Sequence, residues 1–190
     1  MNDLAGTLSD LGYENLFMRL DSADLDRVWS EPGAAERLRE LVLNPAAAVG
    51  PRFLAAEVLF ARAPNFPPDE LHSALASVYG RALAMAEVAN PWGLPGETDG
   101  AAGQHLLQLG DAAIDPLIEL LDDGRRVVYS GSKEATFGNS YAYRVKDLAA
   151  FYLSQLTGLP YAVHERPANR DFEIGSLRKT IRERRDGGRT

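Results

Sequence analysis

The chain has 190 residues, of which 45% are apolar and 25% are charged, as expected for a soluble globular protein with one well-buried core. It contains no cysteine, which excludes disulfide bonds, thiolate nucleophiles and cysteine zinc sites. No stretch approaches the roughly 20 apolar residues of a membrane span, so we expect a cytoplasmic protein with no membrane partner.

The net charge of −7 is distributed unevenly along the chain. Up to Asp123 there are 7 Lys and Arg against 20 Asp and Glu, and from Gly124 onward there are 13 against 7. The acidic part repels nucleic-acid phosphates, whereas the basic end can bind nucleic acid, an acidic protein or the acidic part of a second copy. We expect an acidic partner or self-association ahead of nucleic acid.

Residues 1–50 are predicted to form short N-terminal capping helices. Leucines recur at helical spacing from Leu4, and Gly12 is expected to interrupt the first helix. Pro32 and Gly33 separate the following helices. A terminal repeat is usually atypical because one of its faces must cover the end of a stack.

Residues 51–123 are predicted to form two helical hairpins. The helix from Pro51 to about Ala63 is apolar on nearly every side and should be among the most buried, and an amphipathic helix follows over Asp69–Glu87. The clearest hairpin is DGAAGQHLLQLGDAAIDPLIELLDD, from Asp99 to Asp123, in which Gly110 suits the end of the first helix.

The pattern of this first helix recurs at an offset of 47 residues. The segments are RFLAAEVL from Arg52, DGAAGQHL from Asp99 and KDLAAFYL from Lys146. Small residues at shared positions permit close approach of helices, and shared leucines fill the space between repeats; the matched sets are Ala55, Ala102 and Ala149, and Leu59, Leu106 and Leu153. Coincidence among alanine-rich helices is the alternative.

With these residues the chain resembles the HEAT-repeat family, particularly its short bacterial members with a small-residue helix, an LGD-type turn and an IxxLIxLLDD helix. The resemblance is good over Asp99–Asp123, fair over Pro51–Glu87 and Tyr143–Gly158, and weak elsewhere. It implies an all-α fold, a short α-solenoid of about three to four stacked helical hairpins, used as a scaffold or binding surface.

The last predicted hairpin, residues 143–185, follows a long insertion loop over residues 124–142, and residues 186–190 are expected to fray. Loops of that length inside a compact domain are usually functional or disordered. This one contains several aromatic and β-branched residues, and the alternation in VVY and YAY permits a small β-hairpin. The whole chain is predicted to be one domain.

Two segments carry the functional hypothesis: the loop NPWGLPG at Asn90–Gly96, whose tryptophan is expected to be exposed, and the loop from Gly124 to Arg144. Tyrosine, tryptophan and arginine are the residues that most often anchor protein interfaces. We therefore expect a non-catalytic protein-binding module whose partner-binding residues are Trp92, Tyr129, Lys133, Glu134, Asn139, Tyr141, Tyr143 and Arg144. The alternative for each aromatic residue is packing of the loop against the helices.

No catalytic, cofactor-binding or metal-binding residues are predicted. The SxxK spacing from Ser130 lacks the companion motifs of penicillin-recognising enzymes, and the three histidines are isolated. The competing hypotheses are nucleic-acid binding through the basic face at Arg178–Arg189 and an enzyme with a site under the long loop. An enzyme like the HEAT-like DNA glycosylases implies a cationic groove, against which the acidic first two-thirds of the chain argues.

Overall fold

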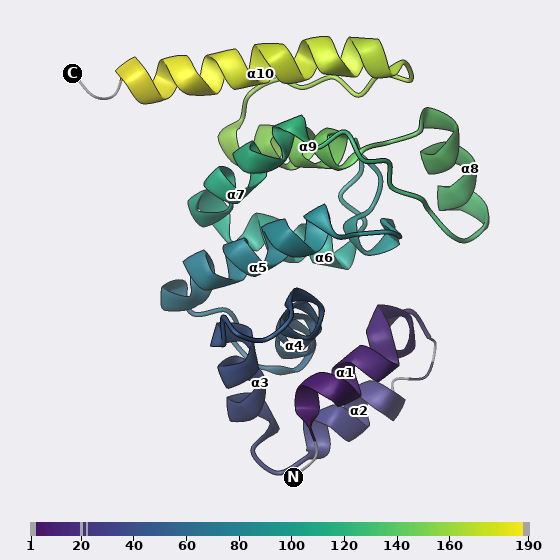
Figure 1. Cartoon of the computed structure of the whole chain (residues 1–190), viewed down its shortest axis with the longest axis vertical. Coiled ribbons are helices and arrows are strands. Elements are labelled where there is room, and N and C mark those ends of the chain that lie inside the picture. Colours follow the sequence, from purple (N-terminus) through teal and green to yellow (C-terminus); the bar gives the residue numbers. More distant parts are fainter. Residues whose placement is uncertain (1–2, 20, 22, 188–190) are drawn as a thin grey trace. The chain divides into compact units, whose positions relative to one another are not determined.

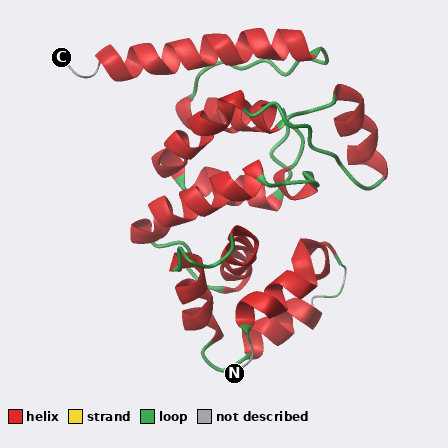
Figure 2. Cartoon of the chain, in the orientation of Figure 1, coloured by secondary structure: helices red, strands yellow, loops and turns green. Residues whose placement is uncertain are grey.

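The computed structural model describes residues 3–19, 21 and 23–187, apart from the side chains at 132–134 (Figure 1). Helices account for 71% of the structure, and the described part of the chain contains no strand (Figure 2). The all-α prediction is therefore confirmed. The contacts divide the chain into two compact units, residues 1–82 and 83–190, and the expected single solenoid domain stays a prediction.

The first unit is built around one buried helix. Its helices are α1 (Leu4–Tyr13), α2 (Ala23–Ser30), α3 (Ala34–Leu43), α4 (Val49–Arg62) and most of α5 (His72–Ala84), with a π-helical turn at Glu14–Met18 and a 3-10 turn at Asp69–Leu71. Helices α1, α2 and α3 all contact α4. Every residue of α4 from Pro51 to Leu59 is buried, as its all-round apolar pattern predicts.

A buried carboxylate lies in the middle of α4. Glu57 is 1% exposed and accepts hydrogen bonds from the hydroxyls of Tyr13, at 3.2 Å, and Tyr79. Burial, followed by the proximity of this carboxylate, raises the pKa of both tyrosines well above the ordinary value. The cluster therefore joins α1, α4 and α5 through phenols that keep their protons.

The second unit contains α6 (Ala101–Gln108), α7 (Ile114–Glu119), α8 (Ser132–Tyr141), α9 (Val145–Thr157) and α10 (Pro167–Gly187), with 3-10 turns at Asn90–Trp92, Gly110–Ala113 and Leu120–Asp122. Helix α9 is its centre and contacts α6, α7 and α10. In Figure 1, α10 lies over α9, and α8 lies to one side of α9.

The residues matched at the 47-residue offset all lie in the cores of their units. Helices α4, α6 and α9 carry them, and the side chains of Ala55, Ala102, Ala149, Leu59, Leu106 and Leu153 are all 0% exposed. Gly110, between α6 and α7, has a φ of 59°, which suits a residue that ends a helix in the left-handed conformation.

The long loop contains a helix, whereas its sequence was predicted to form a loop that permits a small β-hairpin. Two isolated bridges, Val88 to Val128 and Arg126 to Arg144, are the β-type pairings of the described residues, and α8 occupies Ser132–Tyr141. The small hairpin that the alternation permits is therefore not formed by the described residues. The extended segment beside Val128 pairs with residues outside the loop, so its alternating pattern has no partner strand within the loop.

The sequence predicts a last helix from about Arg170 to Arg184, and α10 is longer than this at both ends. Pro167 lies in its first turn, where a missing N–H costs no helical hydrogen bond, and the helix continues to Gly187. Asp186 and Gly187, assigned to the frayed tail, are therefore helical, and the rest of that tail, 188–190, lies outside the described residues.

Candidate functional site

The two loops singled out from the sequence are hydrogen-bonded to each other. The Asn90 side chain donates to the carbonyl of Ser130 at 2.7 Å and accepts from its N–H at 2.8 Å. The Tyr129 hydroxyl donates to the carbonyl of Gly93 at 3.0 Å, and the N–H of Ala89 donates to the carbonyl of Val128 at 2.8 Å. We call this assembly, residues 88–96 and 125–144, the α8 platform.

Trp92 belongs to the platform and is buried, although the sequence predicted that it would be exposed. Its side chain is 2% exposed, and its carbonyl accepts a hydrogen bond from the hydroxyl of Tyr152 in α9. A Cβ on Gly103 would overlap that hydroxyl and the Trp92 carbonyl. The small residue in α6 thus permits the turn at Trp92 to approach α9 closely, which ties the tryptophan into the core.

Tyr129 and Asn139 hold α8 against the extended segment that precedes it. The Asn139 side chain accepts from the N–H of Tyr129 and donates to its carbonyl, both at 2.9 Å. The Tyr129 ring is 3% exposed and packs on Gly138, where a Cβ would overlap the ring. Both residues were predicted to bind a partner, and in the structure their contacts dock α8.

Tyr141 and Tyr143 lie at the end of α8 with ring centroids 5.5 Å apart. Tyr141 is half-buried, whereas Tyr143 is 3% exposed and lies under the guanidinium of Arg170, whose Cζ is 5.0 Å from the ring centroid. Burial raises the pKa of Tyr143 to about 12, and the positive charge of Arg170 opposes that rise. Tyr143 therefore remains a neutral phenol near neutral pH.

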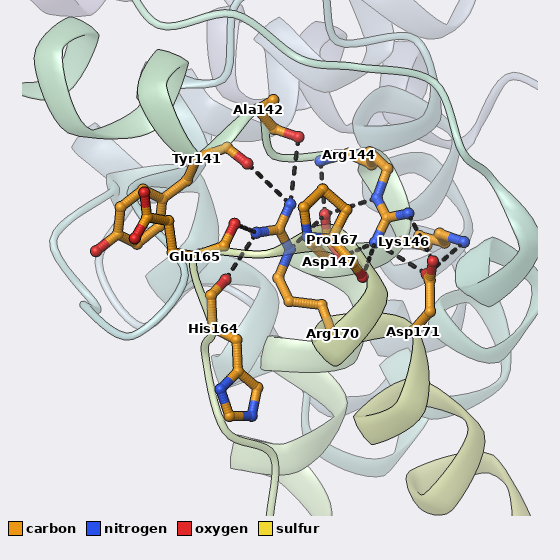
Figure 3. Close-up of polar contacts among 10 residues, drawn as sticks. All are labelled: Tyr141, Ala142, Arg144, Lys146, Asp147, His164, Glu165, Pro167, Arg170 and Asp171. Atoms are coloured by element: carbon orange, nitrogen blue, oxygen red, sulfur yellow. Dashed lines mark hydrogen bonds and ion pairs between the residues drawn. The ribbon is translucent and has the colours of Figure 1, made fainter.

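Arg144 is the first residue of a charged network at the start of α9 (Figure 3). Its backbone N–H and its Nε donate to Oδ2 of Asp147 at 2.9 and 3.0 Å, and its Nη2 donates to Oδ1 at 2.8 Å. Its guanidinium also pairs with Asp171 of α10 at 2.9 Å, and Lys146 pairs with the same carboxylate at 2.8 Å. These contacts cap α9 and raise the pKa of Arg144, chiefly through Asp147.

Arg170 completes this network from the first turn of α10. Its Nη1 donates to the carbonyls of His164 and Glu165 at 2.7 Å each, and its Nη2 donates to those of Tyr141 and Ala142 at 2.9 and 3.3 Å (Figure 3). Its Nε lies 3.2 Å from Oδ2 of Asp147, and both side chains are 0% exposed. One buried cation therefore joins the end of α8, the start of α9 and the segment before α10.

Arg170 was not predicted as part of the site. It was assigned only to the start of the last helix, and it lies 23 residues after Asp147, with no periodic spacing to connect the two. Its contacts are mostly to backbone carbonyls, which every residue carries, so a sequence pattern could not indicate them.

The accessible apolar side chains of the platform are a different set from the predicted one. Phe137 on α8 is 55% exposed, Val128 is 52% exposed and Val88 is 42% exposed. Val88 and Val128 are neighbours through their bridge. The side chains of Lys133 and Glu134, two of the predicted contact residues, lie outside the described part of the structure.

The platform is held together by side chains that have partners within the chain. Its buried tyrosines, and Arg170 beside them, form the intramolecular contacts given above. Within the described residues no group of three or more His, Asp or Glu side chains could hold a metal ion, and no helix is long and apolar enough to cross a membrane. Comparison of the chain with protein-family models, curated proteins and solved structures found no match.

Proposed function

We propose that this chain is a protein-binding module that contacts its partner with the α8 platform. The observation that carries the proposal is the exposure of Phe137 on α8, and of the neighbouring Val128 and Val88, in segments that buried side chains hold together. An interface needs apolar area that leaves water on binding, and a pre-organised surface loses little conformational entropy.

The HEAT-like α-solenoid remains part of this proposal. Three observations support it: the equivalent alanines and leucines of α4, α6 and α9 are buried, small residues stand beside them, and the helices of the second unit contact one another around α9. In such a scaffold the helices provide the rigid support and an inserted segment provides the specificity. The insertion here is the segment that forms most of the platform.

Phe137 is a sharper test residue than those predicted from the sequence. Arg144 pairs with Asp147 and Asp171, so replacing it also perturbs the start of α9. Phe137 is more than half exposed, and its replacement removes apolar surface with little effect on the core.

The test is affinity capture from the native lysate with the full chain, comparing wild type, Phe137→Ser and Leu43→Ser. Leu43 is the matched control because its side chain is also exposed, at 47%, but it belongs to the first unit. We expect one protein to be retained by wild type and Leu43→Ser, and its affinity for Phe137→Ser to be weaker by about 1–3 kcal/mol. Equal retention by all three proteins contradicts the assignment of the site to the platform, and the absence of any specific protein contradicts the proposed function.

A further inference from the structure

A small cavity lies away from the platform. It is formed between α10 and the segment that consists of α7 and the 3-10 turn at Leu120–Asp122. Its volume is about 200 Å³, and its apolar lining comes from Ile118, Leu121 and Ile181. Leu121 and Ile181 are almost fully buried, so the floor belongs to the core of the second unit. Such an apolar floor repels water and favours an apolar group.

The rim of the cavity is formed by two ion pairs with an arginine between them. Arg178 pairs with Asp122 at 2.8 Å at one end, and Arg185 pairs with Asp115 at the other. Arg182 stands between them at helical spacing and lines the same cavity, but it forms no ion pair with any described residue. The corresponding position on α7, between the two aspartates, is occupied by Ile118.

The charges around Arg182 favour one anionic group rather than a polyanion. Two of the three rim arginines already have carboxylate partners, so one guanidinium remains to receive a ligand. A nucleic acid needs several free cations along its backbone. The pKa of Asp122 is lowered chiefly by the hydrogen bond from Arg178. The positive charge of Arg182 contributes to this lowering.

We propose that this cavity binds a small organic anion, with its carboxylate or phosphate on Arg182 and its apolar body against Ile118, Leu121 and Ile181. The size fits one ring or a short alkyl chain, since an engineered apolar cavity of about 150 Å³ binds benzene. A guanidinium offers paired N–H donors that match either head group. The ion pairs at both ends of the rim limit the length of the ligand.

The experiment follows the isoleucine methyl signals of the full chain by NMR during titration with benzoate, phenyl phosphate and neutral benzamide. We expect saturable shifts at Ile118 and Ile181 with at least one anion, and at least tenfold weaker binding of benzamide. Comparison of the two anions identifies the preferred head group. No saturable shift with either anion up to about 10 mM overturns the proposal, because that limit already corresponds to very weak binding.

Three variants separate the site from a general charge effect. Arg182→Gln should weaken binding of the anion at least tenfold, whereas Lys179→Gln, which removes the same charge from a 78% exposed side chain of α10, should leave it unchanged. Ile118→Glu places a carboxylate beside Arg182 and should abolish binding, provided that its amide spectrum shows a folded chain. Equal losses for Arg182→Gln and Lys179→Gln contradict the site. An acidic peptide and an oligonucleotide are titrated in the same way. If only they shift the methyl signals of Ile118 and Ile181, the cavity binds a macromolecule, and the proposal is overturned.

Discussion

At the scale of single residues, the second unit depends on charges that are removed from water and paired with one another. Arg170 and Asp147 are both 0% exposed, and the arginine also reaches four backbone carbonyls. Burying such a pair is not in itself a large gain in stability, but removing one partner leaves the other groups without donors. Substitution of Arg170 or Asp147 is therefore expected to lower the stability of the fold strongly.

Replacing Arg170 should therefore be far more costly than replacing a surface arginine. We expect Arg170→Met to lower the free energy of unfolding by about 3–5 kcal/mol, because Asp147 and the carbonyls of Tyr141 and Glu165 lose their buried donor. Urea denaturation measures the change. The matched control is Arg178→Met, whose partner Asp122 is 84% exposed and which should cost less than about 1 kcal/mol. Similar losses of stability for the two variants would contradict the conclusion that Arg170 joins α8, α9 and the segment before α10.

Asp171 provides a test of the same network by pH. Its partial burial raises the pKa, but the hydrogen bonds from Arg144 and Lys146 more than offset this and hold it below the ordinary value of 3.8. A folded-state pKa below the unfolded one contributes stability that is present above about pH 4 and is lost as the pH falls through the folded value.

We expect Lys146→Gln to move the pKa of Asp171 upward, toward its ordinary value, because one of two cationic partners is removed. NMR titration of the carboxyl carbons of the full chain measures the pKa of Asp171 directly. Thr180→Gln is the control, because Thr180 lies on α10 with Asp171 and its replacement does not change the charge. It should leave the pKa of Asp171 unchanged. A downward or absent shift in Lys146→Gln would show that Lys146 does not act on this carboxylate.

At the scale of elements, the helices with strong periodicity were predictable and the helix that forms the platform was not. The buried run from Pro51 and the stripe of α9 are encoded by local spacing, which sequence reasoning can read. The position of α8 depends on Asn139 reaching the backbone of Tyr129, and the burial of Trp92 depends on Tyr152, 60 residues away. Such tertiary contacts override local patterns, so the segment was predicted as a loop that permits a hairpin, and the tryptophan was predicted to be exposed.

The region of the candidate site was predictable from the sequence, but its exposed residues were not, because they too depend on tertiary contacts. The unusual length and aromatic content of the segment indicated the right region, and the hydrogen bonds between Asn90 and Ser130 bring the two loops together. The assignment of contact residues assumed that aromatic side chains face a partner. In the structure Tyr129 and Tyr143 are buried and Phe137 is the exposed aromatic residue of α8, a difference that needs coordinates.

Gly138 should be required for docking of α8. A Cβ at this position overlaps the ring of Tyr129, so Gly138→Ala should separate α8 from that ring and cost about 1–3 kcal/mol. Gly175→Ala in α10 is the matched control, because its Cβ meets open space and alanine is the better helix former by up to about 1 kcal/mol. Amide hydrogen exchange should accelerate in Ser132–Tyr141 only for the first variant. Unchanged exchange in both variants would contradict the docking role of Gly138.

At the scale of the whole molecule, the chain combines two compact helical units with an unequal distribution of charge. The excess of acidic residues extends to Asp123, and the basic excess of the remainder is partly neutralised by pairs such as Arg178 with Asp122 and Arg185 with Asp115. The basic face expected to compete for nucleic acid is thus partly occupied within the second unit. This favours protein recognition at the α8 platform over nucleic-acid binding along α10.

The most direct test of this account is amide hydrogen exchange of the full chain, free and in complex with the protein recovered by affinity capture. The account predicts new protection in residues 88–96 and 125–144, centred on Phe137, with little change in α1 to α4. Protection confined to α10 or to the first unit, with α8 exchanging as in the free chain, would contradict the assignment of binding to the platform.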